Sequence, residues 1–328
     1  MKYLSKRQYI LISVIFSLIY CISSSEAAEL EQITLAISPF KNLMNKPDLD
    51  WMEEGFAETL TTKLNHIKRL NLVERVQFNE IIDEMKLEMA GITEENASNV
   101  GKLLRADYLI IGSFQKLDIG PDSILKINAR LVNVKTGKIE QGKAASEEGP
   151  YNSVFKIQET LAAKISMLLG IGLSDSEIKH MEINETTSVT AYELYNQAKN
   201  ETDDLRKEKL LEKALQYDPS YAKVHLLLGS YYGVKSMTNA YFDNSFLLHL
   251  KTAIELDPNL FEAHYAMGDF YYRKSITYRS QQDEREEEAI KKALFYLNIF
   301  IKNKKDSKAR YYTWKVKKAQ NKVKKLSF

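Results

Sequence analysis

The side chains that could perform catalysis include pairs of adjacent carboxylates and five histidines. Glu53 with Glu54, and Glu94 with Glu95, have the side-chain type that general acid–base catalysis uses. Each pair falls in the first turn of an expected helix, where negative charge stabilises the helix dipole. We therefore interpret these acids as helix-start residues and predict no catalytic residue among them.

The histidines predict packing rather than metal binding. His225 and His264 hold equivalent positions in an internal repeat and are expected to face a neighbouring helix, whereas His66, His180 and His249 are far apart in the sequence and lack ligand spacing. Walker, GxGxxG, HExxH, CxxC and GxSxG motifs do not occur. The sequence thus predicts a protein that is not an enzyme, with no catalytic, cofactor-binding or metal-binding residue and no cofactor. An enzyme without a recognisable motif is the alternative.

The N-terminus predicts export. Lys2, Lys6 and Arg7 precede the apolar run Ile10–Tyr20, and the small, polar SSSEAA follows. This order is typical of a secretory signal peptide, and we place it over residues 1–27 with cleavage after Ala27. The expected location is therefore the periplasm or cell envelope.

The single cysteine offers a second interpretation of the same segment. Leu18 to Cys21 could form a lipobox, which predicts lipidation at Cys21 and an outer-membrane lipoprotein. The bulky Tyr20 lies where a small residue is normally required, so both interpretations stay open. In either case one cysteine allows no internal disulfide.

Charge excludes one class of partner and marks one segment. The net charge is only +2, which gives no global attraction to nucleic acid, and none is predicted as a partner. Residues 302–325, however, contain eleven Lys or Arg and one acid. As a capping helix, this segment has a merely solvated lysine face. As a binding surface, it contacts anionic lipid or polysaccharide of the envelope, with Tyr311, Tyr312 and Trp314 at the interface.

The sequence predicts two regions of different secondary structure, and the residues discussed above are distributed over them. The hydrophobic patterns predict an α+β mixed-sheet domain in the order β-α-β-α-α-β-β-β-α, followed by an all-α helical solenoid. Expected strands cover 33–40, 70–75, 108–111, 124–134 and 139–146, and helices cover 50–64, 78–89, 93–104 and 153–169. Asp50 with Glu53 predicts a capping box, and Gly137 a hairpin turn. The strand at 108–111 is expected to be covered on both faces, and the one at 139–146 to lie at an edge.

The C-terminal half contains a repeat with an offset of 39 residues. His225, Gly229 and Tyr232 recur as His264, Gly268 and Tyr271, and Asp218-Pro219 recurs as Asp257-Pro258. These features resemble tetratricopeptide (TPR) repeats, which are ~34 residues long. The predicted domains are a signal peptide (1–27), a mixed-sheet domain (28–172), a polar linker (173–189), about three TPR-like repeats (190–307) and a basic capping helix or tail (308–328).

The first helices of such repeats line a concave surface, which predicts a site for a protein or peptide partner. Amphipathic tyrosines suit such a surface. Plain solvated helix surface is the alternative. The expected peptide-binding residues are Tyr192, Asn196, Lys199, Lys223, Leu226, Tyr265, Asp269 and Tyr272.

The first domain resembles a known family in five successive stretches. They are AISPF (36–40), WMEEG (51–55) with LTTKL (60–64), LVER (72–75) with EIIDE (80–84), GKLLRADYLIIGS (101–113) and ARLVNVKTG (129–137). These stretches resemble CsgG-like periplasmic domains, a group that includes FlgO-like and TolB-N-like domains. The resemblance implies a role in envelope assembly or secretion, and we expect this domain either to self-associate or to dock at the envelope.

One departure argues against pore formation. A CsgG-type pore needs long transmembrane hairpins inserted in this domain, and each spanning strand takes ~9–11 residues. Only fifteen residues separate Ser113 from Ala129, and the strands themselves occupy most of them. We therefore expect an adaptor or accessory protein that is not itself a pore. A lipoprotein subunit of a curli-like secretion apparatus is the alternative.

Overall fold

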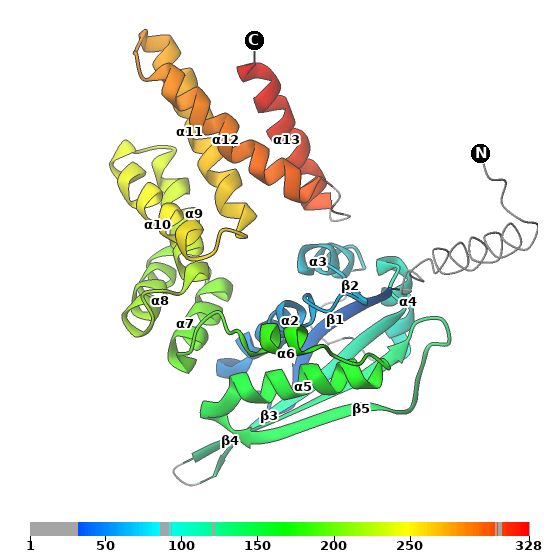
Figure 1. The fold of residues 1–328 in the computed structure, drawn as a ribbon. Coiled ribbons are helices and arrows are strands. Elements are labelled where there is room, and N and C mark those ends of the chain that lie inside the picture. The colour runs from blue at the N-terminus through cyan, green and yellow to red at the C-terminus, as the bar shows by residue number, and fades with distance from the viewer. Residues whose placement is uncertain are drawn as a thin grey trace, which may run out of the picture.

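The computed structural model describes residues 32–85, 92, 94–119, 122–305, 307 and 310–327. The expected signal peptide, Cys21, the helix stop at Gly91 and the helix start at Thr93 lie outside these residues. The described residues form a mixed-sheet α/β domain that is followed by helices (Figure 1).

The α/β domain contains five strands and the helices that cover them. Its elements are β1 (Ile33–Asn42), α2 (Trp51–Leu64), β2 (Leu70–Leu72), α3 (Arg75–Glu84), α4 (Glu94–Leu104), β3 (Tyr108–Ile119), β4 (Asp122–Asn133), β5 (Lys138–Pro150) and α5 (Val154–Leu168), with short 3₁₀ turns at Pro47–Leu49 and Tyr151–Ser153. The strand order is β2-β1-β3-β4-β5. Strands β2, β1 and β3 are parallel, and the pairs β3–β4 and β4–β5 are antiparallel. This confirms the predicted mixed sheet.

Two hydrophobic cores lie on the two faces of the sheet. Helices α2 and α5 cover one face around Phe40, Phe56 and Phe114. Helices α3 and α4 cover the other around Phe78. Strand β3 contributes Ile110 to the first core and Leu109 to the second, as a strand covered on both faces must. Strand β5 is at the edge, and Gly137 adopts the positive φ of +70° that its hairpin turn requires.

The predicted capping box at α2 is wrong. Residues 47–49 form a 3₁₀ turn, so Asp50 already has helical torsion angles and its side chain does not cap the helix. Instead, Asp50 accepts a hydrogen bond from the Asn42 side chain (2.8 Å) and Glu53 accepts one from the Asn42 backbone N–H (3.0 Å). Both carboxylates therefore tie the start of α2 to the end of β1. The predicted strand 70–75 is also shorter, because Arg75 begins α3.

The segment predicted to be a polar linker contains a helix, α6 (Asp175–Glu182). Ser174 and Glu177 form a capping box at its start. At its other end, the ammonium of Lys63 donates to the Met181 carbonyl (2.7 Å) and to Asn184 (2.9 Å). Because Met181 is buried in the same core as α2, this connection packs against the α/β domain.

The helical array that follows consists of consecutive antiparallel pairs and a last helix (Figure 1). Its elements are α7 (Val189–Asn200), α8 (Asp204–Tyr217), α9 (Ala222–Ser236), α10 (Asp243–Leu256, after a 3₁₀ turn at Ala240–Phe242), α11 (Phe261–Gln281), α12 (Glu286–Lys304) and α13 (Arg310–Leu326). Glycines allow close packing within two pairs. A Cβ at Gly229 would lie 2.5 Å from Leu250, and one at Gly268 would lie 2.7 Å from Leu297, so larger residues there would push the helices apart.

Candidate functional site

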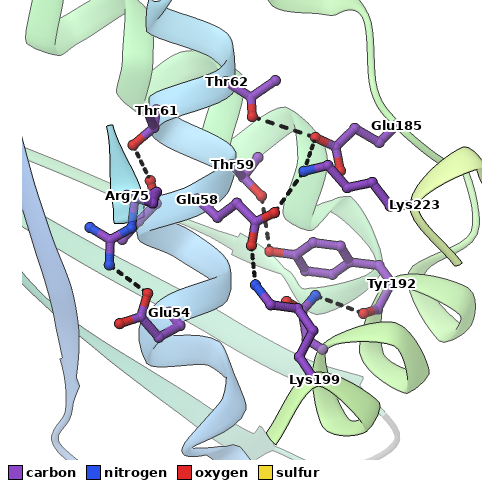
Figure 2. Close-up of polar contacts among 12 residues, drawn as sticks. Glu54, Glu58, Thr59, Thr61, Thr62, Arg75, Glu185, Tyr192, Lys199 and Lys223 are labelled. Atoms are coloured by element: carbon purple, nitrogen blue, oxygen red, sulfur yellow. Dashed lines mark hydrogen bonds and ion pairs between the residues drawn. The ribbon is translucent and has the colours of Figure 1, made fainter. Parts of the chain in front are cut away.

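The array meets the α/β domain first where α7 and α9 approach α2, a contact that we call the first junction (Figure 2). The carboxylate of Glu58 on α2 lies at its centre. It forms an ion pair with Lys199 on α7 and accepts a hydrogen bond from Lys223 on α9 at 2.7 Å. One acid of the α/β domain thereby contacts the first helices of two successive helix pairs.

Lys223 also contacts the segment that connects α6 to α7. Its ammonium lies 2.7 Å from a carboxylate oxygen of Glu185, which also accepts a hydrogen bond from Thr62 of α2 at 3.4 Å. The side chains of Glu58 and Lys223 are only 22% and 19% exposed. Two lysines and two carboxylates thus form a partly solvent-exposed network in which the positive and negative charges balance.

The network controls the protonation of its members. Burial alone would raise the pKa of Glu58, but the ammonium groups of Lys223 and Lys199 outweigh it and hold that pKa well below its usual range. Burial alone would lower the pKa of Lys223, yet the carboxylates of Glu185 and Glu58 raise it well above its usual value. Both groups are therefore charged at neutral pH.

Tyr192 on α7 extends the core of the α/β domain into the array. It is 4% exposed, and its ring packs against Trp51 and Phe155 at centroid distances of 5.7 and 5.4 Å. Its hydroxyl is 3.0 Å from the Thr59 hydroxyl and accepts a hydrogen bond from Gln158 at 3.3 Å. Burial raises the pKa of Tyr192 above its usual value, so the phenol is neutral.

A second junction lies at the far end of the array. Glu74, which precedes α3, accepts hydrogen bonds from Lys304 at 3.3 Å and from the hydroxyl of Ser307. The Tyr311 backbone N–H, in the first turn of α13, donates to Glu80 of α3 at 2.6 Å. The array therefore leaves the α/β domain at α7 and returns to it at α12 and α13.

Between the two junctions lie two adjoining clefts of about 370 and 640 Å³. Both are lined by Thr62, Asn65, His66 and Lys223. The smaller cleft continues to Glu74 and Lys304, and the larger continues to the loops that precede α9 and α11. Their walls combine polar and apolar side chains, and they come from the α/β domain on one side and the array on the other.

The predicted peptide-binding residues lie against the chain's own elements. Tyr192, Asn196, Lys199 and Lys223 face α2, and Asn196 is 3% exposed, with its amide donating to the Tyr192 carbonyl at 2.8 Å. Leu226 packs between α9, α10 and α11. Of these residues, only Lys223 lines the clefts described above.

The three predicted residues on α11 face α13. The ring of Tyr265 packs against Phe300 at 5.0 Å, with the ammonium of Lys315 at 4.7 Å from its centroid. Asp269 forms an ion pair with Lys322, whose ammonium is 5.3 Å from the Tyr272 ring. Helix α13 therefore covers part of this surface and leaves the three side chains half-buried.

The sequence analysis did not identify the acids that pair with lysines of the array at the two junctions. They are Glu58, Glu74 and Glu185. A weak signal existed for the first of them. Gly55, Thr59 and Thr62 form a small and polar stripe beside the apolar stripe of α2, which indicates a second packed face. Nothing local identifies what packs there, because the partners of Glu58 are 141 and 165 residues away.

The histidines are closer together than their spacing indicated. His66 stacks on His180 at a centroid distance of 4.8 Å, and His225 Nδ1 lies 3.0 Å from His249 Nδ1. Histidines that are distant in the sequence thus form two neighbouring pairs in the fold. Within the described part of the chain, however, no group of three or more potential metal ligands comes together.

Comparison with known proteins informs the first domain. Residues 29–124 match the family model described as the curli production assembly/transport component CsgG. The N-terminal domain is CsgG-like. The match contains β1, β2, β3 and helices α2 to α4, and it includes Glu58 on α2 and Glu74 just before α3.

Several solved structures are similar to less than half of the chain. They include the PelC dodecamer from Paraburkholderia phytofirmans (13% identity, 45% of this chain and 93% of that chain, TM-score 0.29), lipoprotein GNA1162 from Neisseria meningitidis (14%, 42% and 98%, 0.30) and E. coli LpoB (19%, 37% and 57%, 0.27).

A curated protein named putative adenylate cyclase 3, from Rhizobium meliloti (strain 1021), is 21% identical over 203 residues. The aligned region is 60% of this chain and 32% of that protein, so this chain spans about a third of the relative's length. Among the helices of the described residues, none is both long and apolar enough to cross a membrane.

Proposed function

We propose that this chain is a non-enzymatic adaptor of the bacterial cell envelope, in which a CsgG-like domain and a TPR-type helical array together hold a segment of a partner protein. The observation that carries the proposal is the CsgG match over residues 29–124, in a chain whose array is fixed to that domain. Export through the N-terminal segment belongs to the same proposal.

Three features support a TPR-type array. The helices form consecutive pairs, the first helices of the second and third pairs begin at Ala222 and Phe261, and an Asp-Pro step precedes each of them. In such arrays the concave side binds extended segments. Here α2 covers the start of that side and α13 covers its end, which leaves the clefts near Asn65 and His66 for the partner.

The connection between β3 and β4 supports an accessory role rather than a pore. The two strands stay in register from Tyr108 paired with Asn133 to Ile119 paired with Asp122. Only residues 120 and 121 connect them, which leaves no inserted segment at this position.

Site-specific cross-linking in cells tests the proposal. A photo-reactive amino acid in place of Asn65 or His66, both exposed in the clefts, should give a discrete cross-linked partner. The same group in place of Lys213, exposed on α8, is the matched control and should give none. Equal products from Lys213, or none from either cleft position, would contradict partner binding in the clefts.

A further inference from the structure

Helix α13 has two faces of different character. Tyr312, Val316 and Ala319 recur at helical spacing and are buried against α12. On the other side, Trp314 is 52% exposed, and the neighbouring lysines at positions 317 and 318 are exposed as well. The helix contains no acidic residue and lies beside α12 at the C-terminal end of the array (Figure 1).

The lysines of this helix divide into two groups by their contacts. Lys315 lies over the Tyr265 ring and Lys322 pairs with Asp269, so these two hold α13 on α11. The other group points outward, and within the part of the chain that the structure describes its members form no ion pair with a carboxylate. Its members are Lys317, Lys318, Lys324 and Lys325.

Exposed aromatic rings accompany the outward lysines. The Lys318 ammonium is 4.0 Å from the centroid of the Trp314 ring, and Tyr311, one turn earlier, is 37% exposed. Trp and Tyr present an apolar body with one polar tip, which suits the boundary between water and lipid. A solvated capping helix needs the lysines for solubility but gains nothing from an exposed indole.

We propose that this face, formed by Tyr311, Trp314, Lys317, Lys318, Lys324 and Lys325, binds the surface of a bilayer that contains anionic lipid. The helix lies along the surface, its ammonium groups meet lipid phosphates, and the two rings enter the headgroup region. A hydrated polysaccharide offers similar charge but no apolar layer for the rings, which is why the rings favour lipid. The array is thereby held at the membrane by its last helix, independently of the partner clefts.

Vesicle titration of the full chain, followed by the fluorescence of Trp314, tests this proposal. Trp51 is the other tryptophan and is buried, so the signal of Trp314 is obtained by subtracting a Trp314→Phe variant. We expect its emission to shift to the blue with phosphatidylglycerol-containing vesicles at low salt. No shift is expected with phosphatidylcholine alone, and high salt should reverse it.

Charge variants provide the second measurement. Each lysine at an anionic surface adds roughly fivefold to the binding constant, so replacing all four outward lysines by Gln should weaken binding by on the order of 100-fold or more. A matched variant removes four exposed lysines elsewhere, and it should bind within about threefold of the parent. The control substitutions are Lys179→Gln, Lys209→Gln, Lys213→Gln and Lys251→Gln.

Three outcomes would overturn the proposal. One is a Trp314 signal that is absent or is the same on neutral vesicles. Another is that the control variant binds vesicles as weakly as the variant without the four outward lysines, which would show that only the net charge of the protein matters. The third is binding of an anionic polysaccharide without any vesicle-induced change at Trp314, which would assign the face to that polymer. Because all substituted side chains are exposed, circular dichroism should match that of the parent in every variant.

Discussion

The two junctions between the α/β domain and the array differ in what they bury. The first combines an aromatic side chain inserted in the core, Tyr192, with a carboxylate that two lysines surround, Glu58. The second combines polar contacts around Glu74 and Glu80 with the partly buried Val76, which packs against the apolar cluster of α12 and α13, and its Glu74 side chain is 33% exposed. The first junction is therefore part of the folded core, and we expect the second, which lies at the surface, to open more easily than the first.

Tyr192→Ala should have the largest effect on stability. Removing a buried aromatic side chain costs about 3–5 kcal/mol through lost burial and the cavity that remains. We expect a decrease of that size in the free energy of unfolding, measured by urea titration with circular dichroism. Tyr217→Ala, at a 53% exposed tyrosine on α8, should change it by less than about 0.5 kcal/mol. Similar losses of unfolding free energy for both variants would contradict the placement of Tyr192 in the core.

Glu58→Gln should have the next largest effect. The substitution leaves Lys199 without its counter-charge and Lys223 with Glu185 alone. Breaking a buried ion pair from one side costs about 3–5 kcal/mol, and partial exposure reduces this to roughly 2–3 kcal/mol. Glu212→Gln, on the exposed side of α8, is the control and should be nearly neutral. If Glu58→Gln is also neutral, the first junction rests on its apolar contacts alone.

The difference in unfolding free energy between the parent and Glu58→Gln should depend on pH, which tests whether the Glu58 carboxylate is the stabilising form. The folded-state pKa of Glu58 is depressed below its ordinary value of 4.5, so its stabilising effect is complete above that value and is lost as the pH falls below it. We expect the gap in unfolding free energy between parent and Glu58→Gln to be constant from pH 7 to about 5.5. It should then narrow as the pH falls below 4.5. If this difference in unfolding free energy instead widens at acidic pH, the pKa of Glu58 is not lowered in the folded protein.

Glu74→Gln should have the smallest effect. It removes a partly exposed ion pair with Lys304, and such pairs contribute about 0–1 kcal/mol. The expected result is nearly unchanged global stability with faster hydrogen exchange in α3 and α13, because local opening becomes easier. A loss of stability equal to that of Glu58→Gln, or exchange that is faster in α7 than in α13, would break the distinction between the junctions.

Local patterns were sufficient to predict most of the fold. The alternation of Leu125, Ile127, Ala129 and Leu131 identified β4, and Gly137 identified its hairpin. The helix at 175–182 was not predicted. Its start is nevertheless visible in the sequence, since Ser174 and Glu177 have the spacing of a capping box. Polar composition was given too much weight there.

The junctions could not be predicted in the same way. The repeat pattern predicted that Tyr192 and Lys223 lie on helices, as they do on α7 and α9, but it could not show that α2 would cover them. Glu58 meets its partners only after both regions have folded, and the sequence contains no local pattern that links positions 58, 199 and 223. The polar faces of separate amphipathic helices look solvated until their partners are known.

Closure of the array onto α3 also sets an order of events during folding. Glu74 and Lys304 are 230 positions apart, whereas each helix pair joins neighbours in the chain. Contacts between distant positions carry the largest loop-closure entropy and form late. We therefore expect the space between the two regions to stay open until this last step, so that the partner segment that we propose would enter before α12 and α13 close onto α3.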